Sequence, residues 1–444
     1  MKKTMENTDD KIVTEFGGPI GATILMVWSH CWMYYLWLSL EFYQGGVFLP
    51  NDWIILKSQL AHSLPTKQSI MVYWGFIIIQ VILAVIIPGP KIKGLSVPTE
   101  NNKQHDYLCN AISCWYITLI AIGLLYYYDI FKVNFLIDNM GSLITTSIIA
   151  GDLVSLSIYI AGIIQNKQIR MYGNIIYDFF MGSYLNPRIG IFDFKMFAEI
   201  RASWMQLFLL TLSAAFKQYE TIGYVTNSMI IMLVAHGLYS NACMKGEECV
   251  PTTWDIFYEK FGWMLIFWNL AGVPYVYCFQ SVYLLKNSHI NHSNAITGVI
   301  LVVLVFAYYI WDTSQSQKNT FRMKLRGTYI NRWTFPQLPW RTLENPKFLK
   351  TECGSTLLID GWWKYARKIH YTCDIIMASI WGLSCGFTGI LPFFYPIFFF
   401  GMIMHRYIRD YERCERKYKK DWNKYCEIVP YAFIPYIYIN LFKL

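Results

Sequence analysis

The sequence predicts an all-α, polytopic integral membrane protein. Of its 444 residues, 55% are hydrophobic and only 15% are charged, whereas soluble domains contain about 25% charged residues. The apolar residues gather in long runs, and one helical crossing of a bilayer requires about 20 of them. Lipid is therefore the expected surroundings, and a single domain over 1–444 is the expected organisation.

Ten transmembrane helices are predicted. The first eight lie at 20–42, 68–88, 108–128, 142–164, 198–216, 225–243, 262–285 and 296–312. The last apolar block, 375–405, is long enough for two short crossings, and Gly386, Gly389 and Pro392 predict a break between them. We therefore expect a short N-terminus (1–19), an eight-helix part (20–312), and a C-terminal part (313–444) that contains a helical hairpin.

Positive charge predicts the orientation of the chain in the membrane. Segment 313–373 contains eleven Lys and Arg residues and segment 406–444 contains nine, out of 38 in the whole chain. Such residues stay on the cytosolic side, and an even number of crossings then places both termini in the cytosol. The expected membrane is the endoplasmic reticulum in a eukaryote, or the inner membrane in a bacterium.

A basic and aromatic run, LLIDGWWKYARKIHYTCD, occupies 357–374. In a soluble protein it would be typical of nucleic-acid binding, but it lies between apolar blocks, so no nucleic-acid partner is expected. Lys318 and Arg322 are four residues apart and share a face if the eighth helix continues past the membrane. Arg406 and Asp410 have the same spacing in the following tail.

Two ligands suit this collection of charges and rings. Arg and Lys bind phosphates and aromatic rings stack on flat groups, which favours a nucleotide cofactor. Anionic lipid headgroups are the alternative. The sequence contains neither a GxGxxG fingerprint after a strand nor a GxxxxGK[ST] loop, so the cofactor site would not be a Rossmann domain. The histidines are scattered without metal-ligand spacing, and no metal site is predicted.

Several long blocks resemble the sterol reductases, a family of NADPH-dependent membrane enzymes that includes delta-14 and delta-7 reductases and the membrane domain of the lamin B receptor. The blocks are EFGGPIGA, YDFFMGSYLNPRIGIFDFKMF, GEECVPTTWDIFYEKFGWMLIFWNLAGVPYVYC, GWWKYARKIHYTCD and LPFFYPIFFFGMIMHRYIRDYERCERKYKKDWNKYCEIVPYAFIPYIY. They cover nearly the whole chain. The resemblance implies a sterol substrate and a cytosol-facing cofactor groove in the C-terminal half, and it leaves the oligomeric state open.

The chain departs from the usual motif of the ring-reducing members at three positions. Those enzymes typically contain RHxNYxGD where this chain has RKIHYTCD, with Lys368, His370 and Cys373 at the differing places. WNLAG likewise replaces a WGDL-like motif. These departures resemble the delta-24(24(1)) branch, which reduces a side-chain alkene in ergosterol synthesis. A delta-7 or delta-14 ring reductase remains the alternative within the family.

The resemblance also implies which residues bind NADPH. These are Lys318, Arg322, Leu358, Trp363, His370, Tyr371, Asp374, Arg406, Asp410, Cys414, Glu415, Arg416, Lys417, Tyr418 and Tyr425. His370 stands where the wider family has Asn, and its imidazole can also carry charge near phosphates.

An isolated alkene does not accept hydride readily, so we expect protonation first and hydride transfer second. The proton requires an acid in a dry pocket, and acidic residues at membrane depth tend to be functional. Asp255 and Glu259 are four apart in TTWDIFYEKFGW, with Tyr258 beside them. These three are the predicted catalytic residues, ahead of Asp178, Glu247 and Glu248. A structural role, through helix capping or pairing with a nearby Lys or Arg, is the alternative for each.

Two other classes have to be weighed. A membrane methyltransferase that binds S-adenosylmethionine has a similar C-terminal arrangement, but such enzymes are much shorter than this chain. A non-enzymatic sterol-binding scaffold is the other. The lamin B receptor owes its scaffold role to a soluble N-terminal domain, and only about 15 residues precede the first apolar run here.

Overall fold

In the part of the chain that the structure describes, the protein is a bundle of long helices with three small two-stranded sheets. The computed structural model describes residues 14–438. Residues 1–13 of the predicted N-terminus and residues 439–444 of the predicted C-terminal part lie outside the described range. The largest buried apolar cluster includes side chains from the first helix to the last long one, such as Ala22 and Tyr407.

The elements follow one another along the chain in three groups. The first comprises α1 (Gly18–Phe42), α2 (Trp53–Ala61), α3 (Lys67–Ile86), β1 (Lys91–Val97), η1 (Pro98–Glu100), β2 (Lys103–Leu108), α4 (Ala111–Tyr127), α5 (Phe135–Asp138), α6 (Met140–Ile164) and α7 (Ile175–Met181). The second comprises β3 (Arg188–Ile189), β4 (Phe192–Asp193), α8 (Phe194–Phe197), η2 (Ala198–Ala202), α9 (Ser203–Ile222), α10 (Asn227–Lys245), η3 (Gly246–Thr252), α11 (Trp254–Phe257), α12 (Trp263–Phe267), η4 (Trp268–Gly272), α13 (Val273–Tyr277) and α14 (Phe279–Lys286). The third comprises α15 (Asn294–Arg326), β5 (Phe348–Lys350), β6 (Thr356–Leu358), η5 (Gly361–Lys364), α16 (Ile369–Ser384), η6 (Leu391–Phe393), α17 (Phe394–Tyr418) and α18 (Lys420–Ile428).

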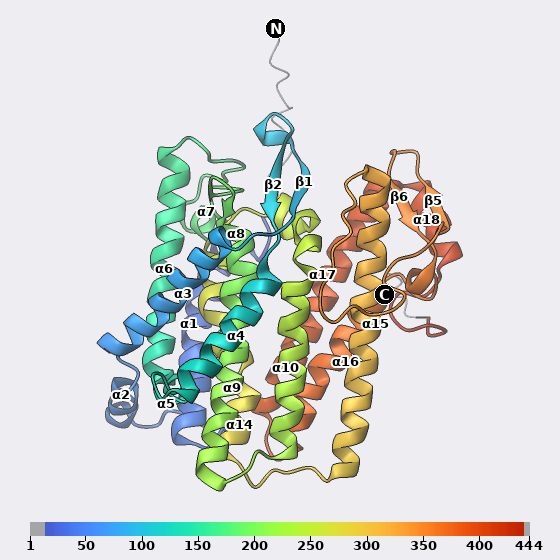
Figure 1. The fold of residues 1–444 in the computed structure, drawn as a ribbon. Coiled ribbons are helices and arrows are strands. Elements are labelled where there is room, and N and C mark those ends of the chain that lie inside the picture. Colours follow the sequence, from blue (N-terminus) through green and yellow to red (C-terminus); the bar gives the residue numbers. More distant parts are fainter. Residues whose placement is uncertain (1–13, 439–444) are drawn as a thin grey trace.

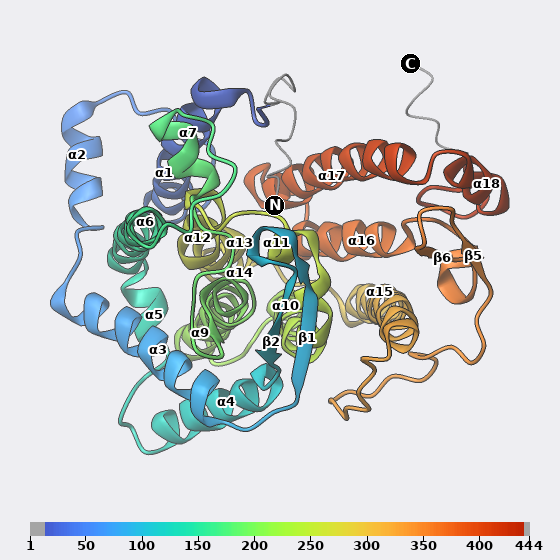
Figure 2. The ribbon, with the colours of Figure 1, turned by 90° about the horizontal axis from the view of Figure 1, so that it is seen from above.

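The three groups lie side by side in the bundle. Viewed along the helices, α9, α10 and the α12–α14 segment are central, the N-terminal helices α1 to α6 flank them on one side, and α15, α16 and α17 flank them on the other (Figure 2). The β1–β2 and β5–β6 hairpins both lie toward the same end of the bundle (Figure 1). The C-terminal elements therefore form one side of the molecule and meet the central helices along their length.

The predicted helical segments are confirmed within residues 14–438. Helices or broken helices occupy each predicted crossing, and α16 and α17 form the expected hairpin around Gly386, Gly389 and Pro392. The eighth helix does continue past its apolar part, since α15 runs from Asn294 to Arg326. Three helices in the described range, α3, α6 and α15, combine the length and the hydropathy that a membrane crossing requires.

The fold is mostly helical, as predicted, but six short strands that were not predicted occur within residues 14–438. The longest hairpin is antiparallel and pairs Lys91 with Leu108 and Val97 with Lys103. Ile92 and Val97 of β1 are buried while Lys91 and Lys93 are exposed, which approximates the period-two pattern of a half-buried strand. No strand was predicted for this segment from the sequence.

The predicted crossing at 262–285 is the one most altered by tertiary structure. It divides into α12, the π-helical turn η4, α13 and α14. Pro274 lacks a backbone N–H, and the side chain of Trp268 packs against Gly272. Mid-helix π turns of this kind are rare and occur frequently at functional sites.

The outer helices present large apolar side chains to their surroundings. Ile79 and Ile86 of α3 and Val302 and Phe306 of α15 are all more than half exposed. Soluble proteins rarely expose apolar surface so continuously. This surface supports a membrane setting.

Gly262 allows two backbone segments to meet at the start of α12. A Cβ built there would lie 2.1 Å from the backbone nitrogen of Gly182, at the end of α7. Backbone atoms cannot move aside as a flexible side chain can. We therefore expect Gly262→Ala to lower the stability of the fold by about 1–3 kcal/mol or more, the usual cost of overpacking. Thermal unfolding in detergent would measure this as a lower Tm. Gly123→Ala is the matched control, because no atom lies within 4 Å of the added Cβ, and an unchanged Tm for both variants would contradict the close approach.

Candidate functional site

A large cavity of about 1030 Å³ opens among the central and C-terminal helices. Its wall is mostly apolar and aromatic, and includes Trp28, Trp204, Trp263, Trp268, Trp311 and Phe398. These side chains come from α1, α9, α12, η4, α15 and α17. Ligand sites are typically apolar cavities with a few placed polar groups, so the polar residues of this wall decide what it can do.

Four carboxylates line the cavity, and three of them are ion-paired. Asp312 lies 2.6 Å from the Lys245 ammonium. Asp255 lies 3.2 Å from the Arg406 guanidinium. Glu248 lies 3.1 Å from Arg332, which does not itself line the cavity. The fourth carboxylate, Glu199, has no ion pair within 4.0 Å among the described residues.

A second feature, which we call the basic–aromatic cluster, consists of Lys318, Arg322, Trp363, Lys368, His370 and Asp410. Trp363 is buried, and its indole N–H donates to the backbone oxygen of Ser314 at 2.9 Å. The Lys318 ammonium lies 4.1 Å from the centre of the Trp363 ring. Neither Lys318 nor Arg322 has a carboxylate within 4.0 Å in the described part of the chain. Two partly buried cations without an anion indicate a binding position for one.

The other half of the cluster joins α16 to α17. Lys368 forms an ion pair with Asp410. The His370 ring lies 5.1 Å from the Trp363 ring and 4.2 Å from the Tyr371 ring. Its Nδ1 atom is buried and has no hydrogen-bond partner among the described residues, although buried polar atoms are normally satisfied. A ligand with polar groups and a flat ring would complete this arrangement.

The structure brings together some of the predicted cofactor residues and separates others. Leu358 packs with Trp363 and Phe321, and the Cys414 thiol lies 3.9 Å from Asp410. Tyr425 is buried with Trp422 in a small cluster that Tyr418 borders. Glu415, Arg416 and Lys417 are exposed on α17. Asp374 is half-buried on α16 beside Tyr239 and Trp311, on the cavity side.

The three predicted acids lie in one short segment, 255–259. Side chains from one face of α17 contact this segment. Arg406 pairs with Asp255, the Arg409 guanidinium lies 3.5 Å from Glu259, and the Arg413 guanidinium lies 4.0 Å from the Trp254 ring. Positions 406, 409 and 413 fall on one side of a helix. Cationic groups of α17 therefore fix the short helix α11 and the residues after it.

Of the three predicted acids, only Asp255 lines the cavity. Glu259 accepts a hydrogen bond from the Trp254 indole, and burial raises the pKa of the Glu259 carboxyl above its ordinary value. Tyr258 is 41% exposed and stacks on Trp254, with 3.8 Å between ring centres.

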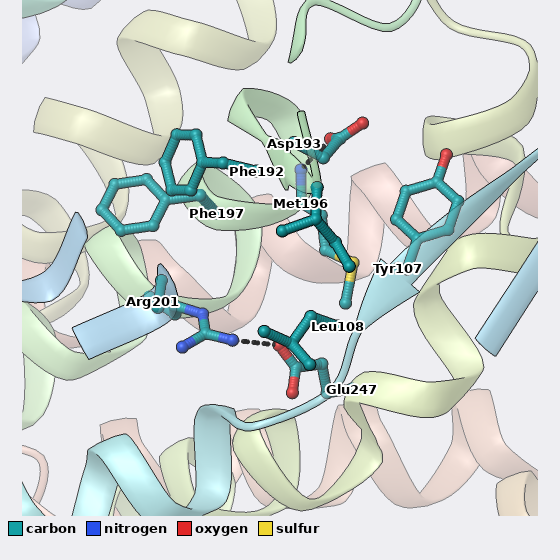
Figure 3. A pocket seen from close by; sticks show the side chains of 10 residues that line it. Tyr107, Leu108, Phe192, Asp193, Met196, Phe197, Arg201 and Glu247 are labelled. Atoms are coloured by element: carbon teal, nitrogen blue, oxygen red, sulfur yellow. Dashed lines mark hydrogen bonds and ion pairs between the residues drawn. The ribbon is translucent and has the colours of Figure 1, made fainter. Parts of the chain in front are cut away.

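The other predicted carboxylates have structural partners. Figure 3 shows Arg201 and Glu247 facing each other in a small pocket that Tyr107 and Asp193 also line, and their atoms approach to 2.6 Å. The Asp178 carboxylate accepts the backbone N–H groups of Tyr172 and Gly173. Glu248, as noted above, pairs with Arg332.

Two residues that belong to the cluster or to the cavity wall were not predicted from the sequence to be site residues. Lys368 was identified only as a departure from a motif, and its partner was not anticipated. Glu199 is the single acidic residue of the predicted crossing 198–216. An acid within an apolar segment is itself a functional signal, and it could have been followed here.

Comparison with known proteins identifies the family of this chain. The model of the ergosterol biosynthesis ERG4/ERG24 family matches residues 10–438. The chain belongs to this family of sterol reductases. It is therefore an enzyme that reduces a carbon–carbon double bond.

Three relatives illustrate the range of the family. The chain is 43% identical to a delta(24(24(1)))-sterol reductase of Aspergillus fumigatus, covering 99% of this chain and 96% of that one. It is also 43% identical to a delta(24(24(1)))-sterol reductase of Gibberella zeae, covering 95% and 73%. A delta(14)-sterol reductase of Dictyostelium discoideum is 35% identical, covering 95% and 91%.

The contacts of Glu259 lead to a prediction about its role. Its carboxylate accepts the Trp254 indole and lies outside the cavity wall, so we expect Glu259→Gln to cost about 1–3 kcal/mol of stability while turnover per folded molecule stays near that of the wild type. Thermal unfolding and sterol analysis on the same preparation would measure both. Trp254→Phe, which removes the indole N–H that Glu259 accepts, should likewise lower the Tm. Retained sterol binding with lost turnover would instead identify Glu259 as the acid.

Proposed function

We propose that this protein reduces the 24(28) double bond of a sterol side chain with NADPH, by protonation of the alkene followed by hydride transfer. The two relatives that are 43% identical carry the name of that reaction. The single structural observation that supports it best is the position of Arg406, which lines the apolar cavity one helical turn before Asp410 of the basic–aromatic cluster. A sterol in the cavity would then lie next to a cofactor in the cluster.

The cluster suits NADPH in its chemistry. Lys318 and Arg322 would bind phosphate groups, since both lack a carboxylate partner in the described range. The rings of Trp363 and Tyr371 would contact the flat parts of the cofactor, and the free Nδ1 atom of His370 would gain a hydrogen-bond partner. The remaining predicted cofactor residues, from Cys414 to Tyr425, would surround the same site. NADPH, when bound, supplies the hydride.

We further propose that the bundle spans its membrane ten times, with both termini and the cofactor site in the cytosol. The positive charge of 313–373 and 406–444 supports this orientation. The C-terminal part, 313–444, is then the cofactor-binding half of a single membrane domain. The membrane would be the endoplasmic reticulum in a eukaryotic host and the inner membrane in a bacterium.

The protein's own part in the chemistry is to exclude water, align the alkene and deliver a proton. Protonation of the terminal methylene carbon of this side-chain alkene forms a new C–H bond. It leaves a tertiary cation at the neighbouring side-chain carbon, C24. The aromatic wall of the cavity, with Trp28, Trp204 and Trp263 among its members, can stabilise such a cation through its π faces. Of the three acids predicted from the sequence, Asp255, Tyr258 and Glu259, only Asp255 lines the cavity.

A ring double bond is the second candidate substrate, because the Dictyostelium discoideum relative is named a delta(14)-sterol reductase. Expression in two fungal hosts separates the candidates, one that accumulates 24(28)-unsaturated sterols and one that accumulates delta(14)-unsaturated sterols. We expect mass spectrometry to find loss of the double bond in the first host only. Loss in the second host only would overturn the side-chain assignment.

The cofactor proposal predicts a specific effect of Arg322→Ala. Removing one charge-assisted hydrogen bond costs about 1.5–3 kcal/mol, so NADPH binding should weaken about 10- to 150-fold. Calorimetry on the purified protein would measure it, with NADH as a second ligand to test whether the additional phosphate of NADPH is bound. Arg326→Ala is the matched control, because Arg326 is exposed one turn later on the same helix. Equal NADPH affinity in both variants and the wild type would contradict the site.

A further inference from the structure

Glu199 differs from every other carboxylate on the cavity wall. Asp255, Asp312 and Glu248 each have a cationic partner within 3.2 Å. Glu199 has none within 4.0 Å among residues 14–438, and its Oε1 atom is buried without a hydrogen-bond partner. An ion-paired carboxylate stays charged, whereas burial without a counter-charge favours the neutral acid.

The charges nearest to Glu199 along the chain are engaged elsewhere. The Lys195 ammonium donates to the backbone oxygens of Ile256 and Glu259, at 2.8 and 2.6 Å. Asp193 accepts the backbone N–H of Met196 at 2.9 Å. Arg201 pairs with Glu247, as Figure 3 shows. Within the described residues none of the three makes an ion pair or a hydrogen bond with Glu199, and Lys195 acts on its carboxylate only at longer range.

The backbone also presents Glu199 in an unusual way. It belongs to the π-helical turn η2, from Ala198 to Ala202, which packs against the second π-helical turn, η4. Glu199 and Ile200 of η2, and Trp268 and Asn269 of η4, all line the cavity. The buried ion pair between Arg201 of η2 and Glu247 of η3 holds η2 in place. Two facing π turns at one cavity are a sign of a functional wall.

We propose that Glu199 is the proton donor of the reaction. This assignment rests on the proposed protonation-first reduction. The π electrons of the alkene take the Glu199 carboxyl proton to form a C–H bond, which leaves a carbocation at the adjacent carbon and a carboxylate on Glu199. The carbocation then takes a hydride, which the reduced nicotinamide would supply, and forms the second C–H bond. This transfer would leave the oxidised nicotinamide. A proton from water restores the acid, so each cycle consumes one alkene, one reduced nicotinamide and one proton.

Asp255 then has a different part. Its carboxylate pairs with the Arg406 guanidinium at 3.2 Å and holds Arg406 at the cavity wall. Because this contact already engages the carboxylate, Asp255 is a positioning residue in this scheme. Among the described residues that line the cavity, Glu199 is the carboxyl without an ion pair.

The test compares Glu199→Gln with the wild type in detergent. The amide keeps the shape of the side chain and breaks no ion pair, so the variant should fold and bind sterol and NADPH with wild-type affinity. Its turnover should fall about a hundred- to ten-thousandfold, the usual contribution of a positioned acid. Asp193→Asn is the matched control: it removes a buried carboxylate six residues earlier that does not line the cavity, and it should keep turnover per folded molecule.

An infrared difference spectrum, wild type minus Glu199→Gln, supplies a readout independent of turnover. It should contain the band of a neutral carboxylic acid, and a carboxylate band in its place would overturn the assignment. If the Glu199→Gln protein is not obtained in folded form, Glu199→Asp is the second variant. It shortens the side chain by one methylene group and so moves the carboxyl away from the alkene. Lower turnover at unchanged sterol binding is then expected, and wild-type turnover would overturn the assignment.

The failure of the inference is distinguishable from that of the proposed function. Wild-type turnover in deuterated water should place one solvent deuterium on the product, because the first C–H bond takes its hydrogen from an exchangeable acid. Absence of that deuterium in the wild-type product would refute protonation by the protein altogether. Deuterium incorporation together with undiminished turnover by Glu199→Gln would leave the proposed function standing and overturn the assignment to Glu199.

Discussion

Charge inside an apolar bundle has to meet opposite charge, and in this protein several of the ion pairs that join distant elements lie along α17. Arg406 and Arg409 hold the segment of Asp255 and Glu259, while Asp410, on the same helix, holds Lys368 of α16. A lone buried charge is expensive, so each of these contacts ties two elements together. The hairpin of α16 and α17 is thereby joined both to the central helices and to the C-terminal cluster.

This arrangement explains how one helix can serve two sites. Arg406 lines the cavity, and Asp410 lies one turn further along α17 within the basic–aromatic cluster. The exposed residues from Glu415 to Lys417 lie beyond this region, at the end of α17.

The unpaired groups are as informative as the paired ones. Lys318 and Arg322 lack carboxylate partners in the described range, and Glu199 lacks a cation there. The cations gather where an anionic cofactor would bind, and the acid faces the apolar cavity where an alkene would lie. An alkene reduction requires a hydride source and a proton source. The unpaired cations would lie beside the first and Glu199 would be the second.

Much of the fold could be predicted from the sequence, because hydropathy and charge are local properties. Runs of about 20 apolar residues indicated every long helical segment, Gly386 and Pro392 indicated the hairpin, and the spacing of Lys318 and Arg322 indicated their shared helix face. The long matching blocks indicated the family. The β1–β2 hairpin was not anticipated, since its alternation is short and its charge is typical of a loop.

The pairing of side chains could not be predicted in the same way. Whether a carboxylate is an acid or half of an ion pair depends on which cation lies within about 4 Å, and the partners here are far apart in sequence: Asp255 and Arg406 are separated by 151 positions. The same holds for Glu199, whose lack of a partner exists only once η2, η4 and α17 are in place. The sequence alone determined the membrane class, the helices and the family, because each is written in contiguous residues. Only the tertiary structure decided which charges are satisfied and which are free to react, because that depends on distances between segments that the chain order does not specify.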